Sequence, residues 1–204
     1  MSIALYTSFQ LLCKKATGVL IIELIRWVLN LLTGDNFVGA EPTMFDRIVG
    51  YNGIKRTFVR SLSSNQPVHI LLVGPAGQAK TLFLKCILET FGETKAFFTV
   101  GGNASKSGLI DVLFDMQPKY LLIDEIEHLK PEYQTALLSL METGILTQTM
   151  HSKVRHIQLK TWVFATSNGT KKLSQPLLSR FRVMYLNQYD FSQFYEIAVK
   201  MLLG

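Results

Sequence analysis

The sequence predicts a doubly wound α/β fold, in which helices cover both faces of a parallel sheet. Apolar runs of strand length alternate with amphipathic stretches of helix length from residue 52 onward. This alternation is typical of parallel strands joined by crossover helices. Two of the apolar runs end in polar groups, one in a loop of small residues and one in two carboxylates, and open α/β sheets carry their chemistry at such ends.

The elements can be placed in chain order. A helix is expected over 52–62, ended by the turn-forming residues of the stretch 63–67. Five parallel strands are expected near 68–73, 96–100, 119–124, 161–166 and 183–186. Helices are expected near 80–91, 105–115, 131–142 and 174–180, and a last one over 190–203.

Length and composition fit one globular α/β domain with part of a second. The 204 residues are 48% hydrophobic and 18% charged, which allows a sizeable core. The net charge of +6 weakly favours an acidic partner such as nucleic acid. Two cysteines are too few for a disulfide framework, so we expect a cytoplasmic protein.

Residues 1–36 are expected to form an extension and an amphipathic helix. Aliphatic residues dominate 18–32, but Glu23 and Arg26 lie in the middle of that stretch, and each costs about 2.5–3.5 kcal/mol at a bilayer centre. We therefore expect a helix that packs against the domain or a neighbouring subunit. A membrane or signal anchor is the alternative.

A loop of small residues follows the first strand and has the sequence Gly74-Pro75-Ala76-Gly77-Gln78-Ala79-Lys80-Thr81. The N–H groups of such a loop and of the following helix bind phosphate, and Lys80 adds a positive charge. Thr81 can offer its hydroxyl to Mg²⁺. An ordinary glycine-rich turn is the alternative interpretation.

Ala79 stands where the phosphate-loop pattern has glycine. A methyl group there costs little if φ is helical, whereas a positive φ would weaken binding. We expect Ala79→Gly to change nucleotide affinity by less than about 1 kcal/mol.

Three further groups stand at or near the ends of predicted elements. Asp124 and Glu125 close an apolar strand, where Asp124 would hold Mg²⁺ and Glu125 would polarise the attacking water. Asn168 closes another strand and would orient that water, or else cap a turn or helix. Arg180 follows a short helix, and the alternative for it is a surface arginine.

In this order, the motifs resemble those of the AAA+ ATPases, over about residues 37–200. The matching segments are Ile48-Val49-Gly50, the loop from Gly74 to Thr81, Asp124-Glu125, Asn168 and Arg180. Details such as Phe45-Asp46 and Leu177-Leu178-Ser179-Arg180-Phe181 are similar to RuvB-like and MoxR-like members, and most of all to archaeal proteins related to the Holliday junction branch-migration helicase.

The resemblance implies ATP and Mg²⁺ as cofactors and a homo-oligomeric ring. Ile48 and Val49 would contact adenine, and Asp124 with Glu125 would form the Walker B pair. Lys80, Glu125, Asn168 as sensor 1 and Arg180 as a finger acting on the next subunit's ATP would be catalytic. Nucleotide would bind to Ile48, Val49, Gly74, Pro75, Ala76, Gly77, Gln78, Ala79, Lys80, Thr81 and Leu82, and the metal to Thr81 and Asp124.

The family's helical lid is represented here only by its first helix. Residues 37–188 would form the ATPase core and 189–204 the start of the lid, so the lid would be truncated or lost. Residues 145–160 alternate as a hairpin would, with basic-capable side chains at His151, Lys153, Arg155, His156 and Lys160. This hairpin would contact DNA; a solvated hairpin is the alternative.

These features together predict an ATP-binding and ATP-hydrolysing protein that remodels nucleic acid in the manner of a branch-migration helicase. A MoxR-like chaperone that remodels a protein partner is the second interpretation. A nucleotide-binding module that does not hydrolyse is the third.

Overall fold

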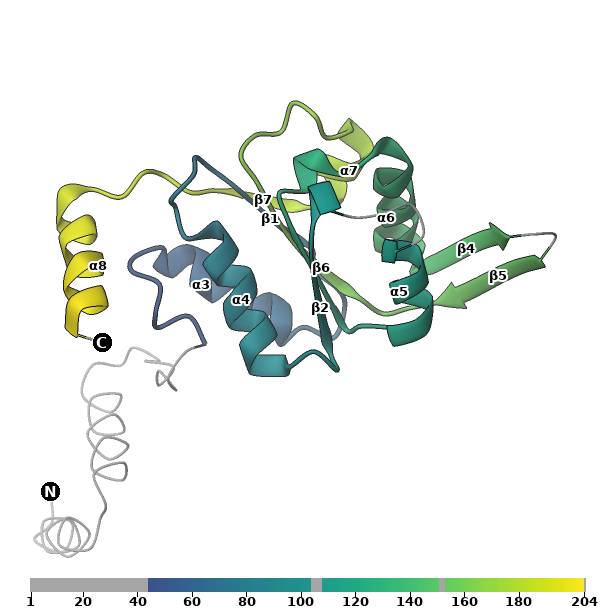
Figure 1. Ribbon diagram of the computed structural model, residues 1–204, viewed down its shortest axis with the longest axis horizontal. Coiled ribbons are helices and arrows are strands. Elements are labelled where there is room, and N and C mark those ends of the chain that lie inside the picture. The colour runs from purple at the N-terminus through teal and green to yellow at the C-terminus, as the bar shows by residue number, and fades with distance from the viewer. Residues whose placement is uncertain (1–43, 104–107, 151–152, 204) are drawn as a thin grey trace, which may run out of the picture. The chain divides into compact units, whose positions relative to one another are not determined.

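The computed structural model describes residues 44–103, 108–150 and 153–203, which belong to one compact unit. Figure 1 shows a sheet with helices on both sides. The predicted N-terminal helix and its apolar stretch, 18–32, lie outside the described residues. Among the helices that are described, none is long and apolar enough to cross a membrane.

The sheet has five parallel strands in the order β2-β3-β6-β1-β7, which confirms the predicted fold class. Its strands are β1 (Ile70–Val73), β2 (Ala96–Val100), β3 (Tyr120–Asp124), β6 (Trp162–Ser167) and β7 (Arg182–Tyr185). The helices are α3 (Asn52–Leu62), α4 (Lys80–Phe91), α5 (Gly108–Met116), α6 (Pro131–Thr143), α7 (Gln175–Arg180) and α8 (Phe191–Leu203). Two short 3₁₀ helices were not predicted, η1 (Gly101–Asn103) and η2 (Ile126–His128).

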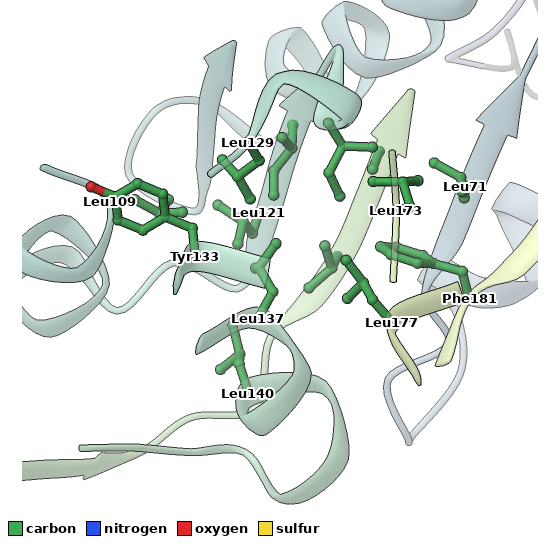
Figure 2. Close-up of a cluster of buried hydrophobic side chains, with 14 of the residues drawn as sticks. Leu71, Leu109, Leu121, Leu129, Tyr133, Leu137, Leu140, Leu173, Leu177 and Phe181 are labelled. Atoms are coloured by element: carbon green, nitrogen blue, oxygen red, sulfur yellow. The ribbon is translucent and has the colours of Figure 1, made fainter. Parts of the chain in front are cut away.

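Side-chain alternation along the strands divides the core into two layers. In β1, Leu71 and Val73 join a cluster with α5, α6 and α7, while Ile70 and Leu72 join a second cluster with α3 and α4. Successive side chains of a strand point to opposite faces, so a continuously apolar strand supplies both clusters. Figure 2 shows the first cluster, with Leu121 of β3 and Leu137 of α6 among its side chains.

Parallel register decides where the carboxyl ends of the strands meet. Val73 of β1 pairs with Ser167 of β6, and Ile123 of β3 pairs with Ala165 of β6. The chain therefore leaves β1, β3 and β6 at nearly the same level. Gly74, Asp124 and Asn168 come together at this edge, as expected for an open α/β sheet.

The strands β4 (Ile145–Met150) and β5 (Lys153–Gln158) form a separate antiparallel hairpin, as the alternating pattern predicted. Gly144 ends α6 with a φ of 72°, and its carbonyl accepts a hydrogen bond from the N–H of Leu159 (2.7 Å) at the base of the hairpin. In Figure 1 the hairpin extends away from the main sheet on the side of α6.

Candidate nucleotide site

A pocket of about 420 Å³ opens where β1 runs through a tight loop into α4. The loop covers residues 74–79 and delivers the chain to the N-terminus of α4, whose first N–H groups have no acceptor within the helix. Such N–H groups and the helix dipole attract anions. The pocket is lined by Ala76, Gly77, Gln78, Ala79, Lys80, Thr81, Leu82, Lys85, Asp124, Glu125, Thr166 and Asn168.

The ammonium group of Lys80 is held at the base of this loop. Its Nζ donates hydrogen bonds to the carbonyls of Gly74 (2.7 Å) and Pro75 (2.6 Å) and to Oδ1 of Asn168 (3.1 Å). Gly74 and Pro75 therefore hold the lysine rather than line the pocket. Burial lowers the pKa of Lys80, and the neighbouring carboxylates of Glu127, Asp124 and Glu125 oppose that shift. The three hydrogen bonds use all three donors of the ammonium group.

Asp124 joins three elements at the carboxyl edge of the sheet. Its Oδ2 accepts a hydrogen bond from the hydroxyl of Thr81 (2.8 Å) at the start of α4. Its Oδ1 accepts a second hydrogen bond from the hydroxyl of Thr166 in β6. The same Thr166 oxygen accepts the backbone N–H of Glu125 (3.0 Å). Thr166 thereby positions both carboxylate residues, a role that the sequence analysis missed.

The oxygen atoms of Thr81 and Asp124 fit a magnesium ion. A hydroxyl and a carboxylate are hard ligands, and Mg²⁺ is commonly held by one or two carboxylates together with substrate phosphates. The two side chains already lie within 2.8 Å of each other and line the same pocket.

Asn168 lies between Lys80 and a carboxylate that the sequence analysis did not consider. Its backbone N–H and its Nδ2 both donate to Oε1 of Glu127, at 2.9 and 3.0 Å. Burial acts to raise the pKa of Glu127, but hydrogen bonds, foremost that from the Asn168 backbone, outweigh burial and hold the pKa below its usual value. The sequence offers little to mark Glu127 as part of a site: it is an acidic residue two positions after Glu125, with apolar residues nearby.

Backbone strain gathers around the pocket. Of the four non-glycine residues with positive φ in the described part of the chain, Ala79 (55°) and Glu125 (52°) line it. A third, Tyr51 (53°), places its hydroxyl within hydrogen-bonding distance of Oε1 of Gln78 in the loop (3.0 Å) and of the carbonyl of Asn187 (2.6 Å). Such conformations cost energy and persist where the surrounding structure imposes them, often at functional sites.

Ile48 and Val49 lie away from the phosphate loop, in a second depression. Both side chains are buried. The depression lies between the segment 46–55 and α8, and α8 contributes Gln193, Glu196 and Lys200 to its lining. Gln78, which lines the first pocket, accepts at its Oε1 the backbone N–H of Tyr189 (3.0 Å) just before α8. The structure thus brings the predicted adenine residues next to α8, the helix that was predicted to begin the lid.

Arg180 does not line the pocket of its own subunit. It is the last residue of α7, and its guanidinium is paired with Glu142 of α6 at 2.5 Å, with 39% of the Arg180 side chain exposed. An ion pair of this exposure contributes at most about 1 kcal/mol. The arginine is therefore available to a neighbouring molecule at small cost.

The basic hairpin is also partly engaged. Arg155 pairs with Asp111 of α5 at 3.1 Å and lies over the ring of Phe114 at 4.8 Å. His156 and Lys160 are exposed, whereas the side chains of His151 and Lys153 lie outside the described residues. Arg155 therefore connects the hairpin to α5, a contact that the sequence did not predict.

The fold and this pocket define a P-loop nucleotide-binding protein of the AAA+ type. A family model described as "Holliday junction DNA helicase RuvB P-loop domain" matches residues 41–186, more than half of the chain. The chain therefore belongs to the RuvB P-loop domain family.

Several curated proteins resemble the chain at low identity. It is 34% identical over 131 residues to "Holliday junction branch migration complex subunit RuvB" of Chlorobium luteolum, covering 60% of this chain and 37% of that protein. It is 25% identical over 169 residues to "Replication factor C subunit 3" of Blastobotrys adeninivorans, covering 80% and 47%. It is 25% identical over 175 residues to "Lon protease" of Mycoplasma mobile, covering 74% and 21%. The chain thus spans between about a fifth and a half of the length of these relatives.

The conformation of Ala79 gives a direction to the effect of replacing it. Its φ of 55° is positive, which is the case in which the sequence predicts weakened nucleotide binding, because only glycine adopts this region freely. We expect Ala79→Gly to relieve about 1 kcal/mol of strain, and to raise Tm by about 2–4 °C and ATP affinity by up to about fivefold. Differential scanning calorimetry and nucleotide titration measure both. The control is Ala76→Gly, at a loop position without positive φ, which should gain neither; equal destabilisation by the two changes would contradict the strain at Ala79.

Proposed function

We propose that the protein binds ATP with Mg²⁺ and hydrolyses it. The observation that carries this proposal is the convergence of Lys80, Asp124 and Asn168 on one pocket at the N-terminus of α4. A cationic donor, a metal-binding carboxylate and a polar amide around an anion site are the parts that phosphoryl transfer requires. Membership of a P-loop family supports ATP as the nucleotide.

The catalytic work falls to a few side chains, because phosphoryl transfer depends mainly on positioning and on stabilising charge. Lys80 would exchange the carbonyls of Gly74 and Pro75 for phosphate oxygens. Glu125, exposed at the rim, would accept a hydrogen bond from the attacking water, and Asn168 would orient that water. A magnesium ion held by Thr81 and Asp124 would neutralise phosphate charge when bound. Ile48 and Val49 would contact the adenine.

Two substitutions separate binding from turnover. Lys80→Ala removes the buried charge and should abolish ATP binding. Glu125→Gln keeps the shape of the side chain but lowers its basicity, so binding should persist while turnover falls by about 10²–10⁴-fold. Isothermal titration and phosphate release measure the two effects, with Lys171→Ala, at an exposed lysine outside the pocket, as the control. Equal ATP affinity of wild type and Lys80→Ala would contradict the proposed site.

We further propose that the subunits form a ring in which Arg180 acts on the ATP of the next subunit. The support is its position outside its own pocket and its weak pairing with Glu142. A charge supplied in this way is worth about 10³–10⁵ in rate.

Activity per subunit should therefore rise with protein concentration and then level off. Arg180→Ala should lower the plateau and leave ATP affinity nearly unchanged. A mixture of Arg180→Ala with Glu125→Gln, each inactive alone, should recover some activity, because a mixed interface pairs an intact Glu125 with an intact Arg180. The proposal would be contradicted if the protein stayed monomeric, its activity per subunit did not change over a wide concentration range, and Arg180→Ala behaved as wild type. Arg180 would then be an ordinary surface arginine.

Remodelling of branched DNA is the biological role that we propose first. It is supported by the RuvB family model and by the exposed side chains of His156 on the hairpin and Lys160 just after it. In Figure 1 the hairpin extends from the domain. Remodelling of a protein partner in the manner of MoxR-like ATPases is the alternative, and Lon protease among the relatives is consistent with it. A non-hydrolysing nucleotide-binding module is the third reading, which phosphate release tests.

DNA binding through the hairpin makes a quantitative prediction. A four-way junction should bind with an affinity that falls as salt rises, and Lys153→Ala with Lys160→Ala should reduce the slope of log K against log[salt] by about 2. Electrophoretic or fluorescence titrations over a salt series measure this slope. The double change Lys171→Ala with Lys172→Ala, at another exposed basic pair, is the matched control. The absence of salt-dependent binding to the junction would favour a protein substrate.

A further inference from the structure

Glu127 is a buried acid beside the nucleotide pocket that is not part of its lining. It lies on η2, directly after the Asp124-Glu125 pair, and only 9% of the residue is exposed. Unlike Glu125, which is exposed at the rim, it turns its carboxylate toward the end of β6. A buried carboxylate is costly unless it is hydrogen-bonded, so its partners indicate what it does.

Both hydrogen bonds to Oε1 of Glu127 come from one residue, while the Ser167 side chain and the backbone of Glu127 itself also favour the charged carboxylate. Oε1 of Glu127 accepts both the backbone N–H of Asn168 (2.9 Å) and the Nδ2 of its side chain (3.0 Å). On the opposite side of the same amide, Oδ1 of Asn168 accepts from Nζ of Lys80 (3.1 Å). The amide thus lies between an acid and a lysine, with its donor toward the acid and its acceptor toward the lysine.

This arrangement selects one of the two orientations of the amide. The oxygen and nitrogen ends of an asparagine side chain have nearly the same shape, so its hydrogen-bond partners decide which way it faces. After a half-turn, Nδ2 would face the ammonium group of Lys80 and Oδ1 would face the carboxylate of Glu127. Both contacts would then be repulsive. In the observed orientation, only one of the two Nδ2 hydrogens is needed for Glu127, which leaves the other for a ligand.

The local backbone keeps Glu127 in place. Glu125 takes the left-handed conformation immediately before η2, and its carbonyl accepts the N–H of His128 (3.0 Å). Gly101 lies so close that a Cβ there would come within 2.4 Å of the Glu125 carbonyl oxygen. The turn that carries Glu127 is therefore packed tightly against η1, with little room to shift.

We propose that Glu127 is a positioning residue, which orients the amide of Asn168 toward the γ-phosphate and the attacking water and so acts on turnover rather than on nucleotide binding. This inference rests on the proposed hydrolysis of ATP. It assigns Glu127 a role distinct from that of Glu125: Glu125 would touch the water, whereas Glu127 acts on turnover through Asn168.

Kinetics on four variants test the proposal. Glu127→Ala should lower kcat by about 10–100-fold with little change in ATP affinity, because misplacing an orienting group by about 1 Å costs up to about 10²-fold. Asn168→Ala should lower kcat to a similar degree. Combining Glu127→Ala with Asn168→Ala should lower it no further than Asn168→Ala alone, since the two act as one unit. Glu127→Gln, which keeps an acceptor, should recover most of the turnover lost in Glu127→Ala.

The control is Glu132→Ala, which removes an exposed glutamate of α6 and should leave turnover and ATP affinity unchanged. Independent losses that multiply in the double variant would overturn the proposal, as would a loss of ATP affinity in Glu127→Ala as large as its loss of kcat. Equal impairment by Glu127→Gln and Glu127→Ala would also overturn it, by showing that the charge itself is required.

A second measurement does not depend on hydrolysis. The side-chain amide of Asn168, assigned by its disappearance in Asn168→Ala, should give two well-separated proton signals in the NMR spectrum of the nucleotide-free protein, one shifted by the Glu127 carboxylate. In Glu127→Ala the two signals should move together. If they stay apart, Glu127 does not orient the amide, whatever the activity. If they move together but the wild type does not hydrolyse ATP, the orientation stands and the proposed function fails.

Discussion

Parallel pairing of β1, β3 and β6 is the constraint on which the candidate site depends. Val73 is level with Ser167, and Ile123 is level with Ala165, so the strands end together. The groups that follow them belong to residues more than 40 positions apart, yet the hydroxyl of Thr81 lies 2.8 Å from the carboxylate of Asp124. A shift of one residue would turn the side chains of a strand to the opposite face and separate these contacts. The apolar side chains that hold the register, such as Leu71 and Val163, thereby also hold the site.

The polar groups of the pocket hold one another in place. Lys80 is already held by two carbonyls and an amide oxygen, and Asp124 by two hydroxyls. Positioned groups such as the side chains of Asp124 and Asn168 stabilise charge without having to reorganise during a reaction. The strained conformations of Ala79 and Glu125 are part of this organisation, because they aim the loop and the acidic turn into the pocket. The packing of the rest of the domain therefore holds Ala79 and Glu125 in left-handed backbone conformations that neither residue favours by itself.

The contacts of Gln78 suggest how the pocket and the following helix are connected. The hydroxyl of Tyr51 lies within hydrogen-bonding distance of the side-chain oxygen of Gln78, which accepts the backbone N–H of Tyr189, so the phosphate loop contacts the segment that leads into α8. The family model ends at residue 186, before α8. The connection therefore joins Tyr51 and Gln78, inside the matched part of the chain, to Tyr189 and α8 beyond it.

Sequence alone determined the strands, the order of helices and strands, and the residues of the phosphate loop, because continuous apolar runs and small-residue turns are local signals. Asp124 and Asn168 were found because each closes an apolar run. Thr166 and Glu127 were not found, since a threonine within a strand and an acid after a turn have no distinguishing local pattern. Tertiary structure alone showed that Thr166 positions Asp124 and Glu125 and that Glu127 holds Asn168. It also showed that Ala79 takes a positive φ and that Arg180 does not line the pocket. Apart from the backbone conformation of Ala79, these are relations between segments far apart in the chain, which the register of the sheet brings together.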